Sequence, residues 1–110
     1  KSLERAQVVR VLYHTIAAFE EMRSWQRDDI YNTLQSLAVA CDMKVRDFLF
    51  PLFIAVSGRS VSLPLFDSLV FLGAPLSLGR LRDALDVLSV SGKERKRLDK
   101  EYQKLQFGQD

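Results

Sequence analysis

The recurrence of apolar residues at every third or fourth position constrains the fold of this chain more than any other feature. Across residues 3–22 these positions are Val8, Val9, Leu12, Tyr13, Ile16 and Phe19. This spacing predicts an amphipathic helix with one buried face. The pattern breaks at residues 24–26, after which Asp28 and Asp29 place negative charge at the positive end of a second helix. The buried face of that helix is expected to hold Ile30, Leu34, Leu37, Ala38 and Cys41.

Residues 45–56 form a more broadly apolar segment that has Pro51 in its interior. Proline removes one helical hydrogen bond and clashes with the preceding turn, so we expect a kink or a restart near Phe50. A strand through residues 48–56 is the alternative, but only Ile54 and Val56 supply β-branched side chains to it. The segment is therefore expected to be helical.

Two further helices are expected between residues 62 and 92. Ser62 is a suitable N-cap, with Pro64 in the first turn, for a helix that ends at Gly73. Pro75 opens the next helix, which residues 89–92 close.

The last segment, residues 93–105, carries Leu98, Tyr102 and Leu105 at helical spacing among many charges, and we expect a loosely docked helix with a frayed end from Phe107. Its basic residues are expected to pair with acidic residues one turn along the same helix, and attraction to an RNA backbone is a secondary explanation. The sequence thus predicts an all-α fold, a compact bundle of about five to six helices. The expected division is a helical domain over residues 1–92 and a charged helix with a frayed tail over residues 93–110.

Composition limits the function classes that such a fold can serve. With 110 residues and 47% hydrophobic content, the chain is the size of one small domain with a real core. A net charge of +2 is too small to indicate nucleic-acid binding by the whole surface, so any RNA contact must be local. We expect no membrane span, because no run of about 18 apolar residues occurs. The start at Lys1 has neither Met nor an apolar signal core, which suggests a cut or processed cytoplasmic chain.

Residues that could carry catalysis or bind a metal are few. His14 is the single histidine and Cys41 the single cysteine, so ordinary zinc sites cannot be built. We expect Cys41 in the core and His14 at the edge of a helix face. The adjacent pairs Glu20–Glu21 and Asp28–Asp29 point about 100° apart on a helix and are expected to be solvated. No catalytic, metal or cofactor site is expected in this chain.

The turn at residues 58–62 is the strongest candidate for ligand contact. In a purely structural interpretation, Gly58 is a helix C-cap, Ser62 is an N-cap and Arg59 is a solvated surface charge. The free amides of a helix start, the hydroxyls of Ser60 and Ser62 and the Arg59 guanidinium could also hold a phosphate or read an unstacked RNA base. The residues alone favour the structural interpretation.

Residues 51–67, PLFIAVSGRSVSLPLFD, with Leu72–Gly73 and Arg80–Leu81, resemble a known signature. The segment is similar to the C-terminal anticodon-binding domain of bacterial class I glutamyl-tRNA synthetases, whose pattern is roughly Pro-Leu-Arg-x-Ala-x-Thr-Gly-(x)3-Ser-Pro-x-Leu-Phe, then Leu-Gly-Lys-Glu and Arg-Leu. The resemblance covers most of the chain, and Trp25 resembles the family's Trp before its second helix.

The resemblance implies an all-helical cage that binds splayed anticodon bases of glutamate tRNA. ATP-dependent ligation, with ATP and Mg²⁺, would belong to a separate domain of the parent enzyme, in protein biosynthesis. DNA and membranes are not expected as partners, and the chain is expected to be monomeric. The implied RNA contacts are Phe53, Ser57, Gly58, Arg59, Ser60, Ser62, Leu63, Leu65, Phe66 and Arg80.

The chain departs from the family pattern at three places. Phe53 stands where the family usually has Arg, which implies stacking in place of a charged contact. Leu63 replaces the proline of Ser-Pro, and Ala74–Pro75 replaces Lys-Glu.

An alternative function is a helical protein-interaction module without an RNA role. It is suggested by the high Phe and Leu content of residues 48–71, which exceeds what one small face needs to bury. Other basic residues at Lys44 and Arg46, and at Arg80 and Arg82, keep the RNA reading open. Salt distinguishes the two functions, because RNA binding weakens steeply as salt rises and apolar docking does not.

Overall fold

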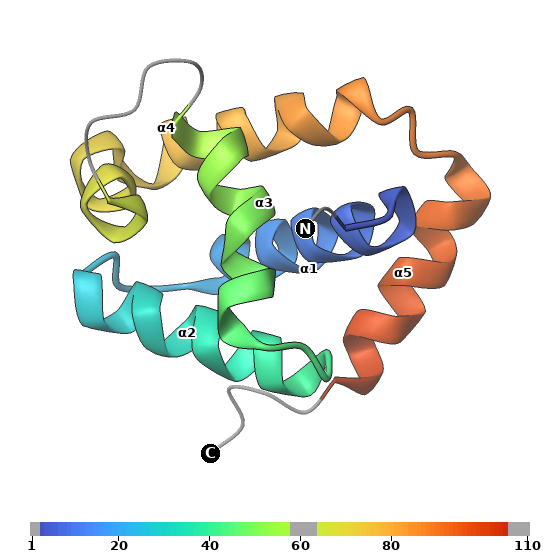
Figure 1. Cartoon of the computed structure of the whole chain (residues 1–110), viewed down its shortest axis with the longest axis horizontal. Coiled ribbons are helices and arrows are strands. Elements are labelled where there is room, and N and C mark those ends of the chain that lie inside the picture. The colour runs from blue at the N-terminus through green and yellow to red at the C-terminus, as the bar shows by residue number, and fades with distance from the viewer. Residues whose placement is uncertain (1–2, 58–63, 106–110) are drawn as a thin grey trace.

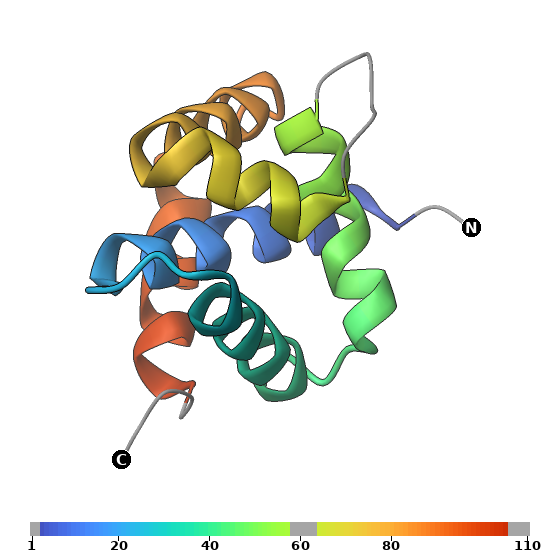
Figure 2. The same ribbon diagram turned by 90° about the vertical axis from the view of Figure 1, so that its left-hand side faces the viewer.

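Helix α1 (Arg5–Glu21) lies at the centre of the fold and packs against each of the other four helices. The computed structural model describes residues 3–57 and 64–105, which contain helices and no strands. The other helices are α2 (Arg27–Ala40), α3 (Val45–Ser57), α4 (Leu65–Val87) and α5 (Gly92–Lys104). In Figure 1, α3 crosses in front of α1, α2 and α4 lie on opposite sides of it, and α5 closes one side. Figure 2 shows the same arrangement from the side. The all-α prediction is confirmed.

The apolar faces predicted from the sequence meet in one core. Ile30, Leu34 and Leu37 of α2 are 0% exposed, as is Phe48 of α3. Cys41 is also buried, as predicted. Burying a side chain of this size contributes about 1.5–3 kcal/mol relative to leaving it exposed, so these positions hold the helices together. Within the described ranges, no helix combines the length and apolarity that crossing a bilayer requires.

Helix α3 is continuous through Pro51, so the predicted restart at Phe50 does not occur. A proline inside a helix costs about 3 kcal/mol, and here the burial of Phe48, Pro51 and Leu52 offsets that cost. The preference for a helix over a strand is confirmed.

Helix α4 bends where the sequence predicts one helix to end and another to begin. Gly73 has φ 83° and ψ 166°, a conformation essentially restricted to glycine, and Pro75 follows at the start of the next helical stretch. The N-cap of α4 is Pro64 and not Ser62, so the predicted cap is wrong, and Ser62 itself lies outside the described residues.

Trp25 fixes the connection between α1 and α2. Its Nε1 donates to the carbonyl of Leu69 at 2.9 Å, and its ring meets the ring of Phe19 edge-on with centroids 4.8 Å apart. The connection is therefore fastened to α1 and to α4 at once.

Helix α5 is held on α1 by polar contacts. Glu94 accepts from Arg5 at 3.1 Å, and Asp99 accepts from the Tyr13 hydroxyl at 2.8 Å. Glu101 accepts from Arg10 Nε at 2.9 Å. The predicted pairing of these acids within their own helix is wrong, because their partners lie on α1.

His14 is fully buried beneath α5, which corrects the prediction that it lies at the edge of a face. Its Nε2 is 2.5 Å from Glu101 Oε1. Burial lowers the pKa of His14, while the Glu101 carboxylate acts in the opposite direction. Burial alone would raise the pKa of Glu101, but hydrogen bonds with His14 and Arg10 bring it below its usual value. An ionised carboxylate only accepts, so the neutral imidazole donates from Nε2.

Candidate nucleic-acid interface

A groove of about 830 Å³ lies between α2, α3 and the start of α4. We call it the basic-aromatic groove. Its lining residues are Leu3, Tyr31, Lys44, Val45, Arg46, Asp47, Leu49, Phe50, Phe53 and Leu65. Tyr31 comes from α2, Leu65 from α4, and most of the rest from the N-terminal two and a half turns of α3.

This groove combines aromatic rings with positive charge. Tyr31 is 42% exposed and Phe50 is 53% exposed, so both rings are accessible from solvent. Lys44 and Arg46 are exposed at the entrance to α3, and Asp47 is the one acid in the lining. The Arg46–Asp47 ion pair is long, at 4.0 Å, and the Arg46 side chain is 86% exposed. The cations therefore stay available to an anionic ligand.

The aromatic surface extends from this groove to the start of α4. The Phe66 ring meets the Tyr31 ring edge-on with centroids 5.2 Å apart, and Arg27 Cζ lies 5.8 Å above the centroid of the Phe66 ring. Arg27 also donates to Asp67 at 2.6 Å. The Phe66 ring is thus fixed in orientation between α2 and α4.

The structure brings some of the predicted contact residues together at this place. Phe53 lines the groove and also packs against the core. Phe66 is not in the lining, but its ring contacts that of Tyr31, which is. Leu65 is only 8% exposed, so its side chain serves mainly the core. The remaining turn residues, Gly58, Arg59, Ser60, Ser62 and Leu63, lie outside the described residues.

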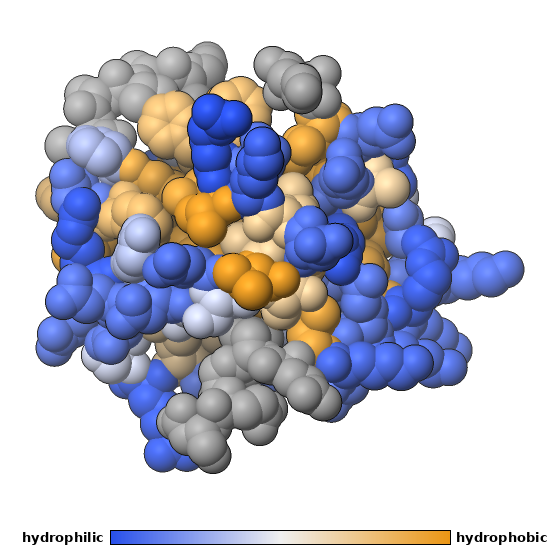
Figure 3. All heavy atoms as spheres, turned by 60° about the horizontal axis from the view of Figure 1, so that its bottom comes forward, coloured by the Kyte–Doolittle hydropathy of each residue, from blue (hydrophilic) through white to orange (hydrophobic). Residues whose placement is uncertain are grey.

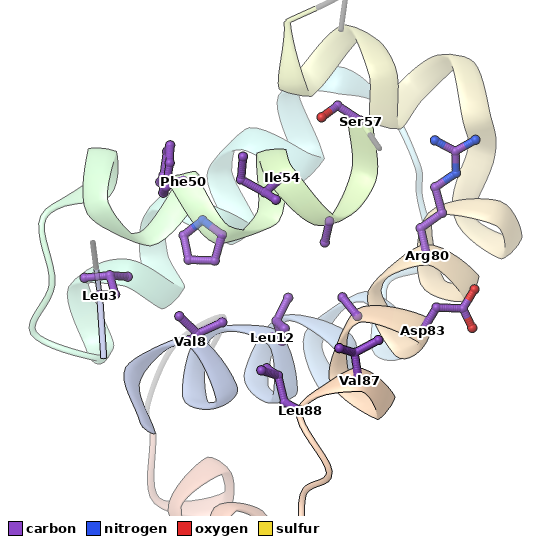
Figure 4. Close-up of a pocket in the computed structure, with 13 residues that line it drawn as sticks. Leu3, Val8, Leu12, Phe50, Ile54, Ser57, Arg80, Asp83, Val87 and Leu88 are labelled. Carbon is purple, nitrogen blue, oxygen red and sulfur yellow. The ribbon is translucent and has the colours of Figure 1, made fainter. Parts of the chain in front are cut away.

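Arg80 and Ser57 lie at a different groove, between α1, α3 and α4. Arg80 Nη1 donates to the carbonyl of Val56 at 2.5 Å, which ties α4 to the last turn of α3. Figure 4 shows Val8, Leu12 and Leu88 facing α3 across this second groove, with Arg80 and Asp83 at one end and Leu3 at the other. One cation and one acid give it no net charge, so it is less suited to RNA than the basic-aromatic groove.

Sequence reasoning did not identify Tyr31 or Phe50 as site residues. The signal for Phe50 was its position three residues before Phe53, which places both rings on one side of a helix. Tyr31 gave no signal of its own, because its approach to α3 depends on how the two helices pack.

Residues 1–85 match the family model described as "Anticodon binding domain". The chain belongs to the anticodon binding domain family. Among its relatives, the glutamate–tRNA ligase of Saccharophagus degradans is 45% identical over 94 residues, which cover 84% of this chain and 19% of the relative. The glutamate–tRNA ligase of Psychrobacter cryohalolentis is 40% identical over 106 residues, 96% of this chain and 21% of the relative.

The chain spans about a fifth of the length of these ligases. The predicted resemblance to a glutamyl-tRNA synthetase domain is therefore confirmed. Nothing in the comparisons supports the alternative of a protein-interaction module without an RNA role.

Proposed function

We propose that this domain binds the anticodon loop of glutamate tRNA as part of a glutamate–tRNA ligase. The observation that carries the proposal is the basic-aromatic groove, where Tyr31, Phe50 and Phe53 lie beside the cations Lys44 and Arg46. Unstacked bases bind proteins mainly by stacking on aromatic rings, and their phosphates bind Lys and Arg. Membership of the anticodon binding domain family and the ligase relatives support the same conclusion.

In this proposal the rings and the cations have separate tasks. The exposed rings of Tyr31 and Phe50 receive bases turned out of the loop, and Phe53 forms the inner wall. Lys44 and Arg46 hold the phosphates that flank those bases. The predicted contacts in the turn, Arg59 among them, would add polar contacts at the far end of α3.

Ligation itself would take place outside this domain. The parent enzyme would bind ATP and Mg²⁺ and would work in the cytoplasm, where tRNA is charged. Within the described residues, no cluster of three His, Cys, Asp or Glu side chains is placed to hold a metal ion. The monomeric state also stays a prediction.

The test compares two phenylalanines of similar kind at different places. Phe50→Ala removes an exposed ring from the groove, and Phe71→Ala removes a ring that is 80% exposed on α4 outside it. Stacking of one base contributes about 1–3 kcal/mol, so Phe50→Ala should weaken binding of the glutamate anticodon stem-loop by about 5- to 150-fold. The Phe71→Ala variant should bind like the wild type in a fluorescence anisotropy titration.

Equal affinities for the two variants would contradict the role of the groove. A scrambled loop should bind the wild type more weakly than the true loop. If both loops bound equally, the domain would hold RNA without recognising the anticodon.

A further inference from the structure

Helix α5 separates its charges onto two faces. The acids Glu94, Asp99 and Glu101 are engaged with α1, through Arg5, Tyr13 and the pair of Arg10 and His14 respectively. Leu98, the buried residue of α5, lies on this inner side. The face that points away from α1 carries five exposed cations: Lys93, Lys96, Arg97, Lys100 and Lys104.

These five cations form one continuous stripe. Their spacing of three, four, seven and eleven residues from Lys93 places them along one side of a helix. At a rise of 1.5 Å per residue the stripe is roughly 16 Å long. In Figure 1 α5 lies at the outer edge of the molecule, and Figure 3 shows that this side is crowded with hydrophilic side chains.

The fold does not use these charges. Among the described residues, none of the five forms an ion pair. Of the five, Arg97 is the one whose charge contributes to the lowered pKa of Glu94. Like charges one turn apart destabilise a helix, so the stripe opposes helix formation. Arg95 is the cation of α5 that turns inward, 3.9 Å from Asp86.

A stripe of five cations without internal partners matches an extended polyanion better than a point ligand. The phosphates of a nucleic-acid backbone repeat at regular intervals and release bound counterions when Lys and Arg neutralise them. Four of the five members are lysines and none is aromatic, so the face suits a phosphate backbone better than unstacked bases.

We propose that the outer face of α5 binds the phosphate backbone of the tRNA whose loop occupies the basic-aromatic groove. The inference rests on the proposed function, and it adds a second contact that carries affinity but no sequence preference. The family match ends at residue 85, before α5 begins, so the match does not include this face.

The test removes two central cations of the stripe. Lys96→Gln/Lys100→Gln lowers the charge by two. Arg23→Gln/Arg82→Gln lowers it equally at exposed positions off α5, where Arg82 is already paired with Glu20. Glutamine is a good helix former, so circular dichroism of the complete chain should be unchanged. Affinity for full-length glutamate tRNA is measured for each over a series of salt concentrations.

Each neutralised phosphate contributes about 0.7 to 0.9 to the slope of log K against log salt. The stripe variant should therefore lose roughly 1.5 from this slope, for the true and the scrambled anticodon alike, and Lys96→Arg/Lys100→Arg should keep the wild-type slope. The control variant should keep most of the slope.

Equal slopes for the stripe and control variants would overturn the inference and leave the proposed function standing. Wild-type protein that binds no tRNA would overturn both. Vesicles containing phosphatidylserine form a separate arm: if the stripe variant lost vesicle binding but kept its tRNA slope, the ligand would be an anionic membrane surface and the assignment to RNA would be wrong.

Discussion

Glu101→Ala should weaken the attachment of α5 to α1 and lower the stability of the domain. Glu101 Oε1 accepts from Arg10 Nε at 2.9 Å and from His14 Nε2 at 2.5 Å. His14 is 0% exposed, so the variant leaves a buried N–H without its partner, which costs about 1–3 kcal/mol. The Arg10 contact adds less, because the Glu101 side chain is 37% exposed and Arg10 keeps its bond to the carbonyl of Cys41.

The expected loss is about 2 kcal/mol, which lowers the melting temperature of a domain of this size by roughly 10 °C. Thermal unfolding followed by circular dichroism measures it. Glu20→Ala is the matched control: it removes an ion pair with Arg82 in which both side chains are about half exposed, and such a pair contributes at most about 1 kcal/mol. If the two variants melted at the same temperature, the buried contact would not be what holds α5, and the reasoning would fail.

Three further variants test the buried histidine and the bend in α4. Burial lowers the pKa of His14 from 6.5 and the pKa of Glu101 is held below 4.5, so the unfolded chain binds more protons than the folded one. Stability to urea should therefore be lost as pH falls below about 6.5 and again below about 4.5, and His14→Gln should remove the first loss; a wild-type urea midpoint that does not change from pH 7 to pH 5 would contradict this. Gly73→Ala should destabilise by about 1–3 kcal/mol, because φ 83° with ψ 166° is nearly closed to other residues. Gly79→Ala, in a helical stretch with open space around the added methyl, should instead stabilise by up to about 1 kcal/mol, and urea midpoints that move the same way would refute the contrast.

Helix positions could be predicted because their signals are local. The apolar spacing of α1 and α2 depends only on residues close together in the sequence, and so does the break at Gly73 and Pro75. The sequence alone therefore predicts these helices and this break. Pro51 was misleading because its cost is local while the burial that offsets it comes from neighbouring helices. The helical type of residues 45–56 was predicted, but the continuity of α3 through Pro51 was not.

Contacts between helices could not be predicted in the same way. His14 was expected at a boundary because α1 alone does not reveal that α5 covers it. The acids of α5 were expected to pair within their helix because such pairs depend only on spacing, whereas Arg5, Arg10 and Tyr13 reach them from residues more than eighty positions away. The position of Tyr31 in the groove could not be predicted either, because it depends on how α2 packs against α3.

The two faces of α5 show how a chain with a net charge of only +2 could serve the RNA binding proposed above. Net charge counts every acid at full weight, but Glu94, Asp99 and Glu101 are engaged with α1 and lie away from the outer stripe. At the groove, Lys44 and Arg46 have Asp47 as the one acid in the lining. Because exposed charges act over about 8–10 Å at ordinary salt, an approaching phosphate responds to these local groups and not to the total. How the helices pack therefore decides the local charge on which the proposed RNA binding depends.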